Sequence, residues 1–191
     1  MTSAKDLIQL GKLVAQAQGW DEARAFKAFE MTDADRARIA GSAVDLLKVF
    51  PRAPGSGAQL AAAFAVQLGR VLDAPIQVVA GTLTVDGVPV LGSRQPVTAA
   101  DVCADGFSGH VWVMIGPNIA ELALFRRANE RDCPPVLARH VHSVFGHDKG
   151  LYVDQWRKVR RQGLGYEPQC VLGTEAVDAL MAGAFRLIKG A

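Results

Sequence analysis

Residues 55–85 read GSGAQLAAAFAVQLGRVLDAPIQVVAGTLTV, and this stretch predicts a helix followed by a strand. The helix is expected over about residues 57–72, where large apolar residues recur at helical spacing beside a run of alanines. The small side chains would let another element approach the helix axis closely, so we expect this helix to be central. The strand is expected over residues 76–85, which are mostly β-branched and apolar.

More strands are expected downstream. Asp86-Gly87 is a two-residue hairpin signal, which predicts a return strand over residues 88–91 before a polar loop. A second hairpin is expected to turn at Gly116-Pro117-Asn118 and to join strands over residues 110–115 and 119–125. The remaining expected elements are a helix opened by Pro134-Pro135 and ending near Phe145, a strand over residues 166–172, and a last helix capped by Thr174.

Two helices are expected before the opening stretch. Ser3 would cap the first, and Thr32 with Asp35 resembles a capping box at the start of the second. The order of helices, then strands, then helices is typical of an α+β domain. We expect one domain over residues 1–191, with N-terminal helices at 1–54, a core at 55–125 and a C-terminal helical part at 126–191.

Composition excludes several classes of protein. Half of the residues are hydrophobic and 21% are charged, which is typical of a globular chain. The formal net charge of +2 is too small to predict a nucleic acid or an acidic membrane surface as the partner. No apolar run approaches the length that spans a bilayer, and the first residues do not resemble a secretory signal. The three scattered cysteines favour a reducing, cytoplasmic location.

Three features predict a reactive site. The turn Gly55-Ser56-Gly57 leads into the predicted central helix at Ala58. A residue there would lie beside unpaired backbone N–H groups at the positive end of the helix dipole, where a cysteine thiolate would be stabilised. His110 begins a later strand, and Glu121 lies on the return strand of the same hairpin, where its carboxylate could orient the imidazole. A base oriented by a third group is the arrangement of a catalytic triad.

These residues also carry a resemblance to the transglutaminase-like (papain-like) cysteine enzymes, over residues 55–125. In that superfamily a Gly-x-Cys pattern starts a small-residue helix, and a turn and a strand ending in Val-x-Gly follow. The corresponding segments here are Leu72-Asp73-Ala74-Pro75 and Gln77-Val78-Val79-Ala80-Gly81. Counting back from Gly81 by the family's spacing reaches Ala58. His110-Val111-Trp112-Val113 resembles the family's His-Ala-Trp-Val strand, and Glu121 falls where the family has aspartate.

The resemblance implies a fold and a chemistry. The fold would be a central helix packed on a small antiparallel sheet with flanking helices. The site would be a Cys-His-Glu triad at Ala58 (the nucleophile position), His110 and Glu121, working on a protein or peptide substrate, or on a small amide or thioester, without a cofactor. The backbone N–H of residue 58 would be one oxyanion donor, and Gln59 and Gln77 are candidates for the second. Trp112 is expected in the core or as a wall of the site.

Alanine at position 58 departs from the pattern, because a methyl group offers no nucleophile. The departure fits an engineered Cys-to-Ala change, or a natural pseudoenzyme that acts as a peptide- or protein-binding module. For a cysteine-bearing form, hydrolysis of an amide is the first choice, as in a protease or deamidase, and acyl transfer as in a transglutaminase is the alternative. The chain as it stands is expected to be catalytically inactive.

Other motifs are weaker. His140 and His142 would point to different faces of a helix, so no metal site is expected. The basic run at residues 157–161 is expected to be a solvated helix face. The Gly55-Ser56-Gly57 turn lacks the ending of a phosphate-binding loop. Ser56 and Cys103 remain as alternative nucleophiles.

Overall fold

A single antiparallel sheet organises the chain. The structure is a computed structural model that describes residues 3–93 and 95–190. The described residues form a six-stranded sheet in the order β2-β1-β3-β4-β5, and β6 pairs with β1. All of these pairings are antiparallel. The strands are β1 (Ile76–Val85), β2 (Val88–Leu91), β3 (His110–Ile115), β4 (Asn118–Glu121), β5 (Tyr152–Gln155) and β6 (Leu164–Val171).

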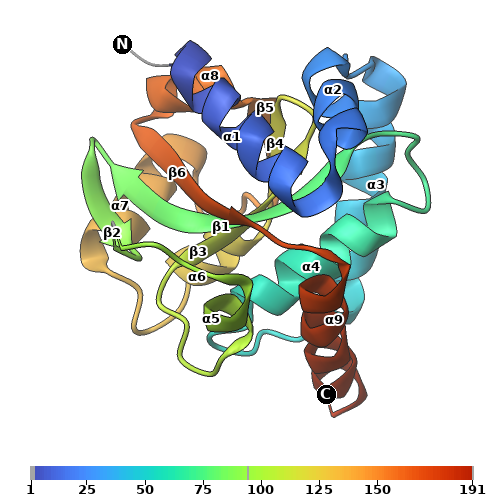
Figure 1. Cartoon of the computed structure of the whole chain (residues 1–191). Coiled ribbons are helices and arrows are strands. Elements are labelled where there is room, and N and C mark those ends of the chain that lie inside the picture. The colour runs from blue at the N-terminus through green and yellow to red at the C-terminus, as the bar shows by residue number, and fades with distance from the viewer. Residues whose placement is uncertain (1–2, 94, 191) are drawn as a thin grey trace.

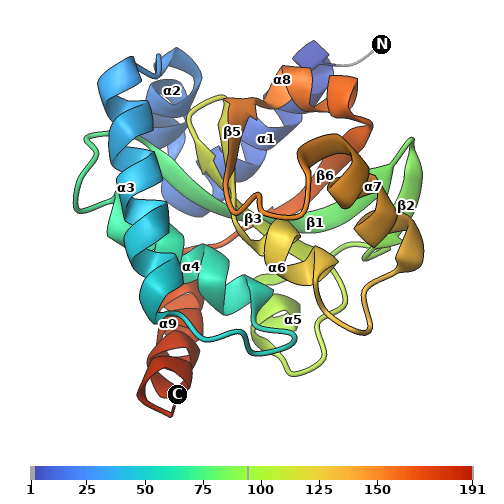
Figure 2. The ribbon, with the colours of Figure 1, turned by 180° about the vertical axis from the view of Figure 1, so that it is seen from behind.

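Helices cover both faces of this sheet (Figures 1 and 2). In chain order they are α1 (Ser3–Gln18), α2 (Trp20–Ala28), α3 (Asp33–Val49), α4 (Gly57–Leu68), α5 (Ala99–Cys103), α6 (Ala123–Ala128), α7 (Pro135–Phe145), α8 (Trp156–Val159), the short 3-10 helix Arg160–Gln162, and α9 (Thr174–Lys189). The α+β class expected from the sequence is therefore confirmed. None of the described helices is long and apolar enough to cross a bilayer.

Alternation along the strands divides the core into two layers. On β3, Trp112 and Met114 face a layer completed by α1, α2, α6 and α7, whereas Val111 and Val113 face a layer completed by α3, α4 and α9. The second layer contains the small residues of α4, which is packed against α3, α6, α9, β1 and β3. The expectation of a central helix that neighbours approach closely is confirmed.

The predicted boundaries need two corrections near the site. α4 ends at Leu68 rather than near residue 72, because residues 69–72 close into turns whose N–H groups donate to carbonyls three or four residues back. The strand expected over residues 119–125 stops at Glu121, because α6 begins at Ala123. The Glu121 carboxylate accepts a hydrogen bond from the Leu124 N–H, at 3.0 Å, and so holds the start of α6.

Other local predictions have mixed outcomes. Asp86 and Gly87 both have positive φ, 49° and 81°, as the predicted two-residue hairpin requires, and Thr32 forms the predicted capping box with Asp35. Thr174 does not cap the last helix; it is the first residue of α9, and Gly173 is the N-cap. The predicted cap of the first helix depends on the Ser3 side chain, which lies outside the part of the chain that the structure describes. The polar loop contains a helix that was not predicted, α5, with its own capping box from Thr98 to Asp101.

Candidate active site

Ala58 and His110 line the same cavity. The cavity has a volume of about 670 Å³ and lies at the beginning of α4. This is within the usual range of small-molecule pockets. Its wall is made by the beginning of α4, the end of β2, the loop from α5 to β3, and residues at the end of α6 and just after it. The lining residues include Gly57, Ala58, Leu91, Phe107, His110 and Arg127. Figure 2 shows α4, α5 and α6 around this region.

His110 forms a buried pair with Glu121. Its Nε2 lies 2.6 Å from Glu121 Oε2, and the side chains are 4% and 1% exposed. The other carboxylate oxygen accepts from the Leu124 N–H. A carboxylate at Nε2 favours the tautomer with its proton on that nitrogen, which leaves Nδ1 as the nitrogen able to accept a proton. This is the geometry of an oriented general base.

Glycines bring His110 to the cavity. Gly81 is the register partner of His110 between β1 and β3, next to a bulge against β6. A Cβ at Gly81 would lie 2.0 Å from the Glu167 carbonyl oxygen, so only glycine fits without a backbone shift. Gly92, with φ +77°, lies close to Gly81 and Gly109 where β2 ends and β3 begins. β3 therefore starts at the cavity wall.

The turn before α4 is held by a carboxylate from the segment after α6. The Gly55 N–H donates to Glu130 Oε1 at 3.2 Å, and Arg127 Nη1 lies 2.6 Å from Glu130 Oε2. A Cβ at Gly57 would lie 3.5 Å from the Ala123 Cβ, an ordinary contact. The beginning of α4 therefore lies against the beginning of α6, two residues after Glu121.

The rings of Trp112 and Tyr166 lie beside the ring of His110. The Trp112 ring is stacked with that of His110 at a centroid distance of 6.1 Å, and the Tyr166 ring lies 5.8 Å from His110 and 5.1 Å from Trp112. Trp112 is fully buried and is not among the cavity-lining residues, so it belongs to the core. Burial raises the pKa of Tyr166 well above its usual value, and the charge of Glu121 adds to this effect.

The two candidate glutamines lie in different places. Gln59 lines the cavity, although its side chain also packs beside Gly183 of α9. The expectation that Gln77 could be an oxyanion donor is corrected by the structure. Its side-chain amide donates to Glu22 Oε1 at 2.8 Å. Gln77 pairs with Met114 in the sheet and lies four residues along β1 from Gly81. This separation is about 13 Å along a strand, so the structure does not bring Gln77 to the cavity.

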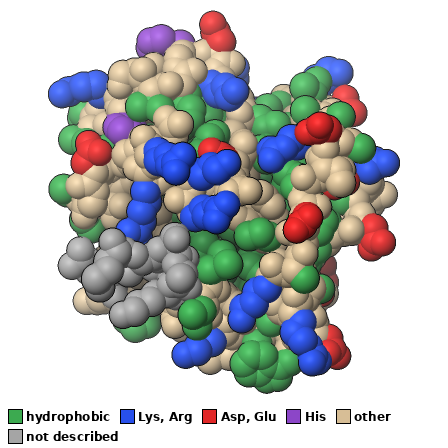
Figure 3. Space-filling model, turned by 90° about the horizontal axis from the view of Figure 1, so that it is seen from above, with side chains coloured by type: hydrophobic (Ala, Val, Ile, Leu, Met, Phe, Trp, Pro, Cys, Tyr) green, Lys and Arg blue, Asp and Glu red, His purple; other side chains and the backbone are tan. Residues whose placement is uncertain are grey.

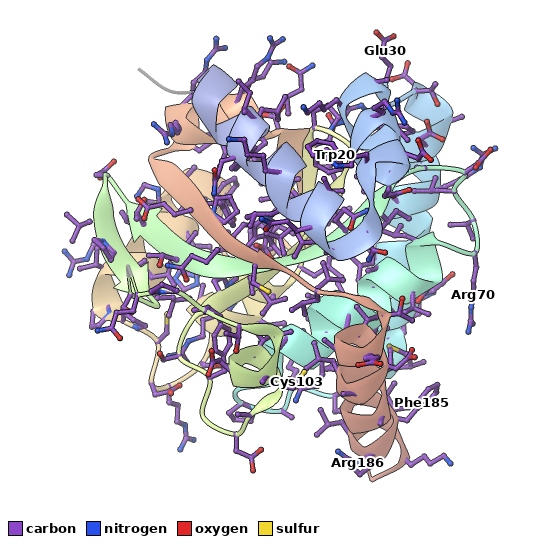
Figure 4. All side chains as sticks on the ribbon, viewed as in Figure 1. Trp20, Glu30, Arg70, Cys103, Phe185 and Arg186 are labelled. Atoms are coloured by element: carbon purple, nitrogen blue, oxygen red, sulfur yellow. The ribbon has the colours of Figure 1, made fainter. Side chains whose placement is uncertain are left out.

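The alternative nucleophiles point elsewhere. The Ser56 hydroxyl donates to the Ala53 carbonyl at 2.6 Å. Cys103 lies on the cavity wall, but its Sγ is 3.7 Å from the Ala176 carbonyl oxygen of α9, and burial raises the pKa of its thiol. Figure 4 shows Cys103 between α5 and α9. A raised thiol pKa is the opposite of what a reactive cysteine needs.

The histidines of α7 and the basic run lie outside the site. His140 Nε2 is 2.7 Å from the Gln162 carbonyl oxygen, and the His142 and His147 rings are 4.2 Å apart. Within residues 3–93 and 95–190 no group of three or more His, Cys, Asp or Glu could hold a metal ion. In the basic run, Arg157 and Arg161 are exposed, and the view from above in Figure 3 shows several Lys and Arg side chains close together near the middle of that face.

Sequence reasoning missed Arg127, Glu130 and Tyr166. No motif marks them, and the contacts of Glu130 with Gly55 and of Tyr166 with His110 join residues that are far apart in the chain. Comparisons with known proteins add no candidates: no family model matches the chain, and no curated protein or solved structure does. The geometry of the residues therefore carries the functional argument.

Proposed function

We propose that the cavity is the active site of a thiol-dependent acyl-transfer enzyme of the transglutaminase-like (papain-like) type, with position 58 as the nucleophile position. The observation that carries the proposal is the buried His110–Glu121 pair beside a cavity that Ala58 also lines. A buried ion pair often adds no stability over apolar side chains of similar volume, so the pair calls for a role beyond stability. A base at the wall of a cavity provides such a role.

The proposed reaction belongs to a form with cysteine at position 58. His110 Nδ1 accepts the thiol proton, and the thiolate attacks the carbonyl carbon of an amide or thioester. The carbonyl oxygen takes the negative charge and is stabilised by unpaired N–H groups of the first turn of α4, including that of residue 58. His110 returns the proton to the leaving amine or thiol as its bond to carbon breaks. Water then completes hydrolysis, or an amine completes acyl transfer.

With Ala58 the same cavity binds without turnover. The methyl group cannot form the acyl-enzyme, whereas the base, the helix N-terminus and the cavity do not depend on it. An amide substrate of a protein, a peptide or a small molecule would then be held but not cleaved. Amide hydrolysis is our first choice for the cysteine-bearing form, and transfer to an amine is the alternative.

The test is the reactivity of a restored thiol. We expect Ala58→Cys to react with iodoacetamide at pH 6 about tenfold faster than an ordinary thiol, because a histidine partner keeps it ionised below its usual pKa. The matched control is Thr174→Cys, which places an exposed thiol at the first residue of α9 without a histidine pair. Peptide mapping by mass spectrometry separates each label from the native cysteines.

Removal of the base completes the test. In the Ala58→Cys protein, His110→Ala should reduce the rate at pH 6 to that of the Thr174→Cys control. Equal rates for Ala58→Cys with and without His110 would reject a thiol–imidazole site. In that case the binding-module alternative would be preferred.

A further inference from the structure

Tyr166 on β6 has no role yet in the proposed chemistry, although it touches the centre of the site. The side chain is 4% exposed and reaches the ring of His110 across β1, which separates β6 from β3. Its hydroxyl oxygen is buried, and no described residue forms a well-aligned hydrogen bond with it. A buried hydroxyl without a partner costs free energy, so its retention calls for an explanation.

The Glu121 carboxylate is the group that this hydroxyl can serve. Burial is the main cause of the raised pKa of Tyr166, and the adjacent Glu121 carboxylate raises it further. A neutral phenol can rotate its O–H toward an acceptor, and each carboxylate oxygen has room for a second donor. Glu121 already accepts from His110 and from the Leu124 N–H, one on each oxygen.

We propose that Tyr166 is a positioning residue, whose hydroxyl donates to Glu121 and keeps that carboxylate directed at His110. This inference rests on the proposed function. Without the hydroxyl the buried carboxylate would lose one of its donors and would be held less firmly against His110. A carboxylate that is held less firmly orients His110 less well and stabilises its imidazolium less. The thiolate of a cysteine at position 58, which pairs with that imidazolium, is then protonated at a higher pH.

The test is the pH profile of thiol labelling in the Ala58→Cys protein. Adding Tyr166→Phe should move the acidic limb of the iodoacetamide rate to higher pH. Labelling below the limb should be about three- to tenfold slower, the size expected for the loss of one ordinary hydrogen bond. The rate at high pH should stay within about twofold, because the free thiolate there needs no carboxylate. A loss of packing alone would not shift the limb.

Tyr152→Phe is the matched control. Tyr152 is also buried, is the register partner of Glu121, and has a hydroxyl 3.3 Å from Asp154 Oδ2. Its substitution should leave the limb in place. If Tyr166→Phe leaves the profile unchanged while labelling still requires His110, the role of Tyr166 is rejected and the proposed function stands. If labelling does not require His110, the proposed function itself is rejected.

A second measurement tests the role of Tyr166 even if the Tyr166→Phe protein fails to fold. The chain has two tyrosines, so 3-fluorotyrosine incorporated into the Ala58→Cys, Tyr152→Phe protein labels Tyr166 alone. The fluorinated phenol is a stronger donor and should move the acidic limb to lower pH. An unchanged limb would overturn the inference.

Discussion

Gly81 on β1 faces His110 on β3 as its antiparallel register partner. Gly81 is the glycine of the Val-x-Gly pattern at residues 77–81. It is also the neighbour that sets the position of the candidate base, His110. Its Cβ-free backbone lies against the Glu167 carbonyl of β6. The sheet cannot keep this register if a side chain is added at position 81.

We predict that Gly81→Ala destabilises the fold strongly. A Cβ would lie 2.0 Å from a backbone oxygen that cannot rotate away, so the bulge between β1 and β6 must shift. We expect a loss of about 3 kcal/mol in the free energy of unfolding, measured by urea denaturation. Gly41→Ala in α3 is the control: a Cβ there meets nothing within 4 Å, and the change should stabilise the helix by about 0.5–1 kcal/mol. A Gly81→Ala protein as stable as the parent would contradict the geometry.

The buried pair should also matter for stability without any catalysis. Glu121→Ala removes the partner of His110 and the acceptor of the Leu124 N–H, and we expect it to cost about 3 kcal/mol, as for other broken buried pairs. Asp45→Ala breaks the exposed pair with Lys48, whose side chains are 67% and 69% exposed, and should change stability by less than about 0.5 kcal/mol. Equal losses in the two variants would argue against a tightly held pair.

Glu130 should control the turn that opens α4. Glu130→Ala removes the acceptor of the Gly55 N–H, and we expect hydrogen exchange at that amide to become about fivefold faster, equivalent to a local loss of about 1 kcal/mol. Glu130→Gln keeps a carbonyl acceptor and should stay closer to the parent. The measurement is amide exchange followed by mass spectrometry or NMR. Unchanged exchange in Glu130→Ala would show that the turn is held by other contacts.

The tyrosines give a prediction at alkaline pH. The pKa of both Tyr152 and Tyr166 is raised, in each case mainly by burial, and the chain has no third tyrosine. The folded state therefore holds these protons above the normal tyrosine pKa of about 10, and the free energy of unfolding falls as the pH rises beyond that value. We expect no phenolate absorbance at 295 nm between about pH 10 and 11 while circular dichroism remains native. A phenolate signal from a folded protein in this range would contradict the burial of one of the two rings.

Local patterns predicted the parts of the site that lie within one segment. The Asp86-Gly87 hairpin, the start of α4 and the strand beginning at His110 all follow from spacing and turn chemistry over a few residues. The expected strand over residues 119–125 was wrong because the run is apolar except for Glu121, so periodicity cannot show where β4 gives way to α6. The Glu121 carboxylate marks that change, through its bond to the Leu124 N–H.

Contacts across the chain explain the other failures. Gln77 was a candidate for the oxyanion, but its partner is Glu22, a residue of α2 that the sequence pattern did not place in a helix. Glu130 meets Gly55 at a separation of 75 residues, and Tyr166 meets His110 across β1. Single-sequence patterns contain no information on such pairs, because tertiary packing decides them.

α6 connects both sides of the cavity. Its first turn is joined to Glu121, which holds the imidazole, and Arg127 near its end holds Glu130, which in turn binds the turn before α4. These links use carboxylates, a guanidinium and backbone amides, and the methyl group of Ala58 contributes no hydrogen bond to them. Under the proposed function, a single codon at position 58 would therefore separate a reactive protein from a purely binding one while leaving this framework intact.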